Sequence, residues 1–516
     1  MQAGGKQRAP ILLAGVATIG SFLFGYDTGV IAGALPYMYL PHSASGLDLD
    51  SLSEGLVTAM LAFGAAFGAV IGGQINDRIG RRKNILILAG LFILGTVGCT
   101  FAMSAEMMYP FRFILGWAVG GASSTVPLYL AETAPKSIRG PIVAVDQFMI
   151  VFGQFVAYVM NAGIARMNHA PEATVELDPT GTYQAGEVVP WDVLQHIDGI
   201  VVSGGNGMAW RWMLILATVP AILLWIGMRM MPESPRWYAA NQRYYEAISS
   251  LKQVRNSEDE VTEEIVEMID LEAQQAKVEQ WSIKQGLRTR WTRRILYIGI
   301  CLGIFDQLTG INTAMWYMPK ILSSAGFSTA DAITLNVVTG FVSAIGSATG
   351  FYVVHKFMRR KVGMTQEACI AISLLVLSAI FHFGVEPHIL DSGEISGSIP
   401  AFVPWLVVAV VCVFVFVKQA GTVVWIVLAE IFPAKIRGAW QGFAIGALWT
   451  FNGVVAFVFP PMMENLGGAK TYLIFALINV VAFLFYWKIV PETKDSSLEE
   501  IEERLKARYS RPGDED

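Results

Sequence analysis

The amino-acid sequence predicts an all-α integral membrane protein with twelve transmembrane helices in two six-helix pseudo-repeats. Three observations predict this class: long stretches without a charged residue, basic residues confined to alternate loops, and an internal repeat. The chain has 516 residues, of which 54% are hydrophobic and 15% charged. Soluble domains average roughly 25% charged residues. The composition therefore disfavours a large soluble protein.

Charge-free stretches of membrane-spanning length recur along the whole chain. About 20 apolar helical residues cross a hydrocarbon core of ~30 Å. The predicted spans are 11–35, 54–75, 84–103, 107–130, 142–165, 210–231, 295–318, 332–354, 366–384, 401–428, 439–463 and 470–490. The second span carries Gly64, Gly68 and Gly72 at four-residue intervals, which indicates close helix packing.

The placement of lysine and arginine predicts the orientation of the spans. Basic residues occupy the loops after the second, fourth, eighth and tenth spans, whereas loops 36–53 and 384–400 have none. By the positive-inside rule both termini are expected in the cytosol, and the protein in the plasma membrane with multiple passes. No cleavable signal peptide is evident before the first span.

Two connections are longer than the others. Residues 166–209 are acidic and are expected outside, whereas residues 238–294 are expected in the cytosol as amphipathic helices. The predicted organisation is an N-terminal six-helix half, a linker, a C-terminal six-helix half and a tail, with the bounds 1–237, 238–294, 295–490 and 491–516.

The two halves repeat each other in sequence. The segment LAETAPKSIRG (130–140) returns as LAEIFPAKIRG (428–438), and DRIGRRK (77–83) returns as HKFMRRK (355–361). The pairs occur in the same order at the ends of equivalent spans, which indicates duplication. Duplicated halves bind cargo between them near the bilayer midplane and alternate access by rocking, so the repeat favours a transporter.

The repeated charges at the cytosolic helix ends are predicted to act as a gate. Acids accompany the basic residues, although basic residues alone would set the topology. Ion pairs of this partly buried kind have small net stability, which suits a switch. Glu132 with Arg139 and Glu430 with Arg437 occupy duplicate positions, so both halves are expected to contribute equally. The predicted gate residues are Asp77, Arg81, Arg82, Glu132, Arg139, Glu233, Arg236, Glu430 and Arg437.

Charged residues inside the spans are candidates for function, because a lone charge in the bilayer is costly. Asp27 and Arg112 come out at ~24 Å and ~22 Å above the inner face when 1.5 Å is counted per residue. The same arithmetic puts Asp306 and Lys418 both at ~18 Å. We therefore predict that each pair neutralises itself, with Asp306 and Lys418 beside the cargo. The alternatives are that Asp27 and Arg112 form a purely structural ion pair, that Lys418 extends alone into the cavity, or that Asp306 is a second proton site.

Uncharged polar residues in the spans are candidates for binding cargo. Gln307 and Asn312 would lie about 140° apart on a straight helix, so Gly310 is expected to break the helix between them. Trp449 and Asn452 are three residues apart and share a face. Amides donate and accept hydrogen bonds without the desolvation cost of a charge. Each of these residues could instead form an interhelical hydrogen bond.

Motifs along nearly the whole chain resemble the sugar porter family of the major facilitator superfamily. They are FGYDTGVIAG, GGQINDRIGRRK, RFILGWAVG, PLYLAETAPKSIRG, PESPRW, QLTGIN, EIFPAKIRG and PETKDSSLEEI, in that order. The chain looks most like bacterial inositol and sugar–proton symporters.

The resemblance implies the major facilitator fold and import of a sugar or cyclic polyol with a proton. It implies that Asp27 and Arg112 are the coupling pair. It matches Gln154, Gln307, Asn312, Trp449 and Asn452 to sugar-contacting positions. Asp306 and Leu448 stand where relatives often have glutamine. An altered pocket favours myo-inositol over glucose or xylose.

Other functions remain as alternatives. A hexose or pentose symporter differs only in cargo, and an uncoupled facilitator would commonly lack an acid at Asp27. No Ser/His/Asp set, HExxH motif or carboxylate metal cluster is visible in the sequence, so we expect no enzyme, no cofactor and no metal site. The expected partners are the sugar or polyol, the proton and membrane lipid, with no nucleic acid.

Overall fold

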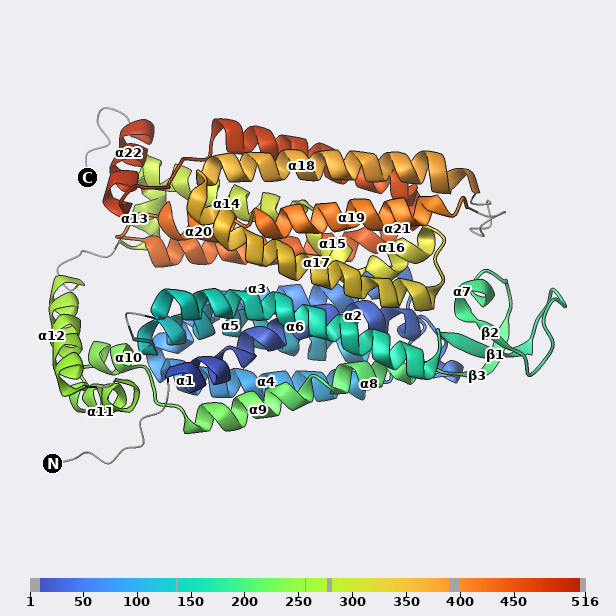
Figure 1. The fold of residues 1–516 in the computed structure, drawn as a ribbon, viewed down its shortest axis with the longest axis horizontal. Coiled ribbons are helices and arrows are strands. Elements are labelled where there is room, and N and C mark those ends of the chain that lie inside the picture. The colour runs from blue at the N-terminus through green and yellow to red at the C-terminus, as the bar shows by residue number, and fades with distance from the viewer. Residues whose placement is uncertain (1–9, 136–137, 256, 276–280, 389–398, 511–516) are drawn as a thin grey trace.

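The structure, a computed structural model, describes residues 10–135, 138–255, 257–275, 281–388 and 399–510. Two bundles of long helices lie side by side, with their helices running along the long axis of the molecule (Figure 1). Helices α10 to α13 and α22 lie at one end, which we call the inner end, and a small β-sheet lies at the outer end.

The first bundle contains the helices of the N-terminal half. They are α1 (Pro10–Ala17), α2 (Ile19–Met38), α3 (Ser51–Ile79), α4 (Arg81–Thr100), α5 (Ala105–Thr133), α6 (Arg139–Asn168), α8 (Ala209–Ile215) and α9 (Thr218–Met230), with the 3₁₀ turn η1 (His42–Ala44). Asp50 caps the start of α3, and hydrogen bonds from Ser53 hold the pKa of its carboxyl below the usual range.

The second bundle contains the helices of the C-terminal half. They are α14 (Arg290–Leu308), α15 (Ile311–Trp316), α16 (Met318–Ser324), α17 (Thr329–Lys356), α18 (Arg359–Ile380), α19 (Phe402–Ala420), α20 (Val424–Glu430) and α21 (Arg437–Lys488), with the turns η2 (Phe381–Val385) and η3 (Glu386–His388). In the described part of the chain, 11 helices are long and apolar enough to cross a membrane. The 52-residue α21 bends at Gly467, where φ is 78°, and so contains the last two predicted spans. The twelve-helix fold class is confirmed.

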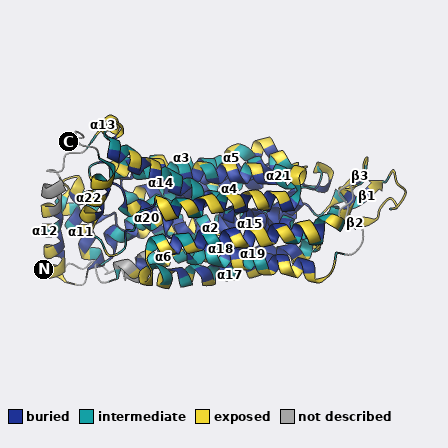
Figure 2. Cartoon of the chain, turned by 90° about the horizontal axis from the view of Figure 1, so that it is seen from above, coloured by how far each residue is buried: buried dark blue, intermediate teal, exposed yellow. Residues whose placement is uncertain are grey.

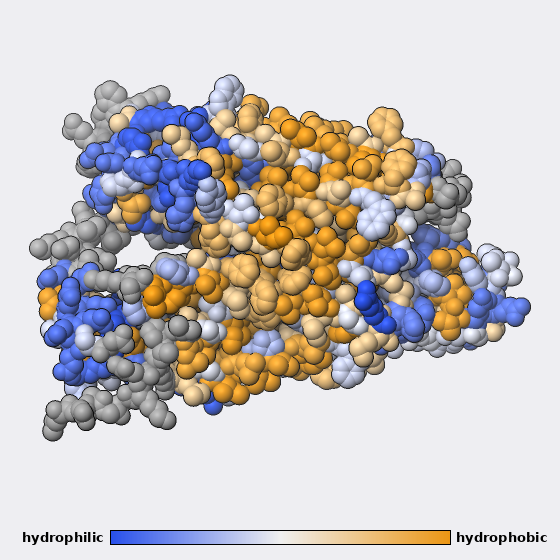
Figure 3. Space-filling view, in the orientation of Figure 1, coloured by the Kyte–Doolittle hydropathy of each residue, from blue (hydrophilic) through white to orange (hydrophobic). Residues whose placement is uncertain are grey.

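The surface of the helical bundles is apolar, as a lipid-facing surface requires. Hydrophobic residues cover the middle of the molecule, and hydrophilic residues gather at its two ends (Figure 3). Large apolar side chains such as Leu223 and Leu477 are more than half exposed. Buried residues concentrate inside the bundles, where the helices face one another (Figure 2).

The glycines of the second span allow the close packing that their spacing predicts. A Cβ atom on Gly64 would overlap the backbone of Phe113 on α5, and one on Gly68 would overlap that of Trp117. Helices α3 and α5 therefore touch backbone to backbone.

The outer connection between α6 and α8 forms a structure that the sequence did not predict. Its strands β1 (Glu172–Leu177), β2 (Val188–Pro190) and β3 (Val201–Gly205) form an antiparallel sheet in the order β2-β1-β3, with the short helix α7 (Trp191–Leu194) after β2. Register pairs Glu172 with Pro190 and Ala173 with Gly205. The prediction of an all-α protein is therefore corrected for this outer connection, which contains a three-stranded sheet.

The predicted amphipathic linker is helical and divides between the two bundles. Its helices are α10 (Pro235–Ala240), α11 (Tyr244–Val254), α12 (Glu258–Gln275) and α13 (Ile283–Arg288), and the tail forms α22 (Leu498–Tyr509). Arg255 ties the linker to the N-terminal half, since Nη1 donates to the carbonyl of Thr133 at 2.9 Å and Nη2 binds Glu264 at 2.8 Å. Trp440 contacts Gly286, so α13 packs on the C-terminal half.

Candidate substrate and coupling site

The helix break at Gly310 brings two amide side chains together. Gly310 has φ 81° and ψ 12°, a left-handed conformation that glycine adopts without steric cost. The chain therefore turns between α14 and α15, and Asn312 Nδ2 donates to Gln307 Oε1 at 2.7 Å. The predicted helix break is confirmed. Because of it, Gln307 and Asn312 lie close together, whereas on a straight helix their side chains would point about 140° apart.

This amide pair is joined to a buried ion pair. Lys418 Nζ on α19 lies 2.5 Å from Asp306 Oδ1 on α14, and their side chains are 6% and 7% exposed. The other carboxylate oxygen, Oδ2, accepts a hydrogen bond from Gln307 Nε2 at 2.9 Å. A continuous polar chain thus runs from α19 through α14 to α15. The ion pair that the equal depths of the two residues predicted is present.

Helix α21 packs against this segment and presents buried polar atoms without partners. A Cβ atom on Gly303 would lie 3.1 Å from Leu448 Cβ, one residue before Trp449. Trp449 Nε1 and Asn452 Oδ1 are buried and have no hydrogen-bond partner among the described residues. An unsatisfied buried polar atom costs about 1–3 kcal/mol. A hydroxylated ligand would satisfy both atoms.

The N-terminal half faces the same region with aromatic and amide side chains. The Phe24 ring lies 5.6 Å from the Trp449 ring, centroid to centroid. Gln154 on α6 is 8% exposed and lies one helical turn from Tyr158. The Tyr158 hydroxyl donates to the carbonyl of Met315 on α15 at 2.8 Å. All five predicted sugar-contacting residues therefore lie on helices that meet between the two halves.

A second buried ion pair lies wholly inside the N-terminal half. Arg112 Nη1 on α5 is 3.3 Å from Asp27 Oδ1 and 3.4 Å from Oδ2 on α2. Both side chains are almost fully buried, at 1% and 2% exposure. Arg112 Nε also donates to the carbonyl of Val57 at 3.1 Å. The structure thus pairs the two residues that were predicted to neutralise each other.

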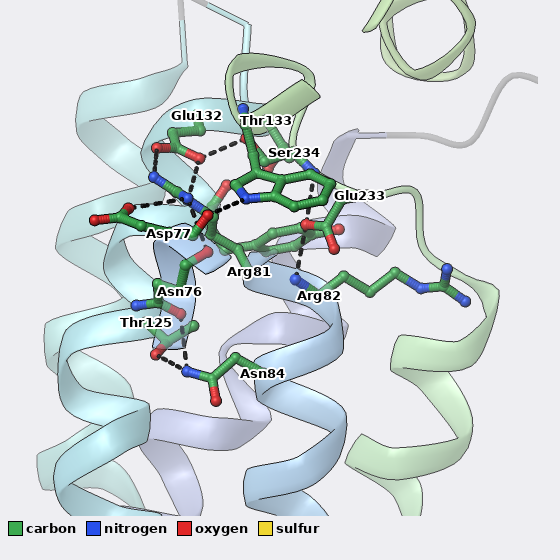
Figure 4. A network of polar contacts seen from close by, with 12 residues as sticks. Asn76, Asp77, Arg81, Arg82, Asn84, Thr125, Glu132, Thr133, Glu233 and Ser234 are labelled. Carbon is green, nitrogen blue, oxygen red and sulfur yellow. Dashed lines mark hydrogen bonds and ion pairs between the residues drawn. The ribbon is translucent and has the colours of Figure 1, made fainter. Parts of the chain in front are cut away.

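The inner ends of the N-terminal helices are joined by a polar network (Figure 4). Arg81 Nε lies 2.9 Å from Glu132 Oε2, and Arg81 Nη1 lies 3.3 Å from Asp77. Glu132 Oε2 also accepts a hydrogen bond from Ser234 Oγ at 2.5 Å. Glu233 accepts one from the backbone nitrogen of Arg82 at 2.8 Å. The network joins α3, α4, α5 and the segment before α10.

The C-terminal half repeats this arrangement with its own residues. Arg359 Nη1 lies 2.8 Å from Glu430 Oε2. Glu492 accepts hydrogen bonds from the backbone nitrogens of Arg359 and Arg360, at 3.1 Å and 3.0 Å. The first network lies within the N-terminal half, and the second joins the C-terminal half to the start of the tail.

The two duplicate gate residues of the C-terminal half bind different partners. Glu430 pairs with Arg359 rather than Arg437, whose Nε donates to the carbonyl of Phe432 at 3.1 Å. Arg437 opens α21 beyond the turn that follows α20, and it folds back onto that turn. The side chain of Arg139 lies outside the described residues. Arg236 Nε has no hydrogen-bond partner in the part of the chain that is described.

Contacts between the halves close the outer side. Lys320 Nζ on α16 lies 2.5 Å from Glu54 Oε2 on α3, and Tyr39 OH donates to Glu54 Oε1 at 2.6 Å. The Tyr317 hydroxyl contacts Thr58 Oγ1 across the same boundary. Glu54 and Lys320 were not predicted from the sequence, because they lie at span ends where charges are common.

These features, two six-helix halves with polar residues and an ion pair at their boundary, define a secondary transporter of the major facilitator class. The chain belongs to the sugar (and other) transporter family, which matches residues 13–505. Within the superfamily it is a sugar porter.

Relatives cover nearly the whole chain. The major myo-inositol transporter IolT of Bacillus subtilis (strain 168) is 38% identical over 494 residues, covering 95% of this chain and 93% of its own length. The galactose-proton symporter of Escherichia coli (strain K12) is 31% identical, also over 95% of this chain and 93% of its own length. The inward open structure of the xylose transporter XylE from E. coli aligns with a TM-score of 0.72 at 27% identity, covering 97% of this chain and 100% of that one.

Proposed function

We propose that the protein imports a sugar or cyclic polyol by proton symport with alternating access, and that myo-inositol is its favoured cargo. The observation that carries this proposal is the pair of unsatisfied buried atoms, Trp449 Nε1 and Asn452 Oδ1, on a helix packed against α14. A ring that bears hydroxyl groups supplies both an acceptor for Nε1 and a donor for Oδ1. Its C–H face suits the Trp449 ring.

The choice of cargo rests on the polar chain at the boundary. Asp306 and Lys418 place charged hydrogen-bonding groups next to Gln307, and charged groups bind hydroxyls more strongly than neutral groups do. A polyol with hydroxyls around its whole ring makes the fullest use of such a site. The similarity to a myo-inositol transporter supports the same choice. The alternative, a hexose or pentose symporter, is favoured by the likeness to the galactose-proton symporter.

For the proton we propose Asp27 as carrier and Arg112 as the group that tunes it. Deprotonated Asp27 binds Arg112, and protonation releases the arginine and shifts the balance between outward and inward states. One proton moving through 100 mV yields about 2.3 kcal/mol. One pH unit adds about 1.4 kcal/mol, so the sum supports roughly 500-fold accumulation.

We further propose the orientation and the moving parts. The inner end faces the cytosol across the plasma membrane, with both termini on that side, as the positive-inside rule predicts. Residues 1–237 and 295–490 move as the two halves, with 238–294 as linker and 491–516 as tail. The inner networks around Glu132 and Glu430 then act as the cytosolic gate.

The test is uptake into sealed proteoliposomes under an imposed pH gradient. Radiolabelled myo-inositol is the probe, and unlabelled inositols, hexoses, pentoses and pentitols compete with it. We expect concentrative uptake that myo-inositol inhibits best. Failure of every sugar and polyol to compete or to be transported would refute the substrate class. Equilibration without accumulation would indicate the uncoupled facilitator instead.

Asp27→Asn tests the coupling. Counterflow exchange of cargo is expected to survive in this variant, whereas uphill uptake is lost, because the site can no longer change charge. Asp198→Asn, at an exposed acid in the outer connection, serves as the matched control and should leave both activities unchanged. The assignment is wrong if Asp27→Asn still concentrates cargo when a pH gradient is imposed.

A further inference from the structure

Another acid besides Asp306 lies buried in the C-terminal half, and it has no cation of its own among the described residues. Glu367 on α18 is 1% exposed, and no cation lies within ion-pair distance of it in the described part of the chain. Its Oε2 atom has no hydrogen-bond partner among the described residues. Eight residues separate it from Arg359 at the start of α18, which places it ~12 Å into the span. An ionised carboxyl in this position, without a cation beside it, would be costly.

The groups around Glu367 come from three other helices. Helix α18 packs against α19, which carries Lys418, and against α21, and Asp306 on α14 is bound to Lys418. The preceding residue, Gln366, contacts Lys418 in either orientation of its amide. In one orientation Gln366 Nε2 lies 3.4 Å from the backbone carbonyl of Lys418. In the other, which satisfies the amide better, Gln366 Oε1 accepts a hydrogen bond from Lys418 Nζ at 3.2 Å. The ring of Tyr486 on α21 packs against Gly363, one turn before Glu367 on the same face.

The charges of this cluster balance only when it holds one proton. Glu367 and Asp306 contribute two carboxyl groups, and Lys418 contributes one ammonium group. With both carboxyls ionised, the buried cluster would carry one net negative charge. A proton on one carboxyl makes the cluster neutral, and its release leaves the ammonium group of Lys418 shared between two carboxylates.

We propose that Glu367, Asp306 and Lys418 form a second proton-binding site, which takes up and releases one proton in each transport cycle together with Asp27 and drives no accumulation once Asp27 is replaced. The proposal rests on the proposed symport. The internal repeat supports it, because α14 and α19 are the counterparts of α2 and α5 in the other half. Those helices carry Asp27 and Arg112. Each half thus pairs an acid on its first helix with a cation on its fourth.

The polar chain of the cargo site connects directly to this cluster. Asp306 accepts from Lys418 through Oδ1 and from Gln307 through Oδ2, and Gln307 in turn accepts from Asn312. Release of the proton from Glu367 draws the ammonium group of Lys418 toward the new carboxylate. Asp306 is then less fully neutralised by Lys418. The amide of Gln307 is held more tightly by Asp306 in that state. The protonation state of Glu367 therefore sets how Gln307 and Asn312 are presented to cargo.

Infrared spectroscopy of the purified protein without cargo tests the site itself. A buried protonated carboxyl gives a C=O stretch separate from that of carboxylates, and raising the pH removes it. We expect Glu367→Gln to lose one such band, because glutamine mimics the neutral form and preserves the fold. Ser378→Ala, which removes a buried hydroxyl elsewhere on α18, should keep the band. An unchanged carboxyl spectrum in Glu367→Gln overturns the proposal.

The ratio of protons to cargo tests the transport role. In proteoliposomes with radiolabelled myo-inositol and no membrane potential, a gradient of one pH unit should hold about 100-fold accumulation in the wild type and about 10-fold in Glu367→Gln. About 10-fold accumulation in the wild type overturns the second site and leaves the symport intact. No gradient-driven uptake in the wild type refutes the symport instead, and the infrared measurement then decides on the site alone.

Discussion

Breaking the buried ion pair between Asp306 and Lys418 is expected to destabilise the protein more than removing both charges does. The two side chains are 6% and 7% exposed, and their charged atoms lie 2.5 Å apart. Asp306→Asn or Lys418→Gln alone leaves the partner charge buried without compensation, which costs about 3–5 kcal/mol. Glu367 can ionise beside an unpaired Lys418, so we place Asp306→Asn at the lower end of that range.

The double variant Asp306→Asn/Lys418→Gln is expected to recover at least half of the larger single loss, since it leaves neither charge behind. The measurement is the free energy of unfolding in detergent for the wild type, both single variants and the double variant, with uptake recorded in parallel. Arg243→Gln is the control, because its pair with Glu246 on α11 is exposed and should be worth only about 0.2–1 kcal/mol. A loss in the double variant equal to the sum of the two single losses would refute the reasoning.

Two further predictions concern the gates. Arg359→Ala removes the partner of Glu430, so it should raise the accessibility of an introduced inner cysteine and slow the return step several-fold. Arg437→Ala should change little, because within the described residues the Arg437 guanidinium bonds a backbone carbonyl and no acid. Equal effects of the two variants would contradict the pairing. On the outer side, Lys320→Gln leaves Glu54, whose side chain is 1% exposed, buried without its cation. Glu54→Gln leaves Lys320, whose side chain is 27% exposed and stays solvated. Lys320→Gln should therefore increase labelling of an introduced outer cysteine by a membrane-impermeant reagent more than Glu54→Gln does. The reverse order would show that the ion pair does not hold the outer side closed.

Much of the architecture was predictable because it depends on local properties of the chain. Stretches without charge fix the spans, since the bilayer tolerates only apolar helices of sufficient length. Gly310 marked the helix break, because a left-handed residue inside a helical stretch is best supplied by glycine. Even the pairs of Asp27 with Arg112 and Asp306 with Lys418 followed from counting the helical rise, which needs no knowledge of neighbours.

The sequence did not predict the contacts that depend on how helices pack. The outer sheet was not predicted, because its strands are three to six residues long and pair across connecting loops. Strands this short give neither a long apolar stretch nor a clear periodicity in the sequence. Glu430 has basic neighbours in sequence, yet it binds Arg359, which the packing of α18 against α20 brings to it.

Glu367 illustrates the same limit. The sequence places it inside the ninth predicted span. The sequence does not show that, among the described residues, no cation lies within ion-pair distance of its carboxyl. The sequence by itself determined the spans and the family. Tertiary structure alone decided that Glu430 binds Arg359 and that Glu367 is buried outside an ion pair in the described part of the chain, because these contacts are set by three-dimensional distance and not by separation along the chain.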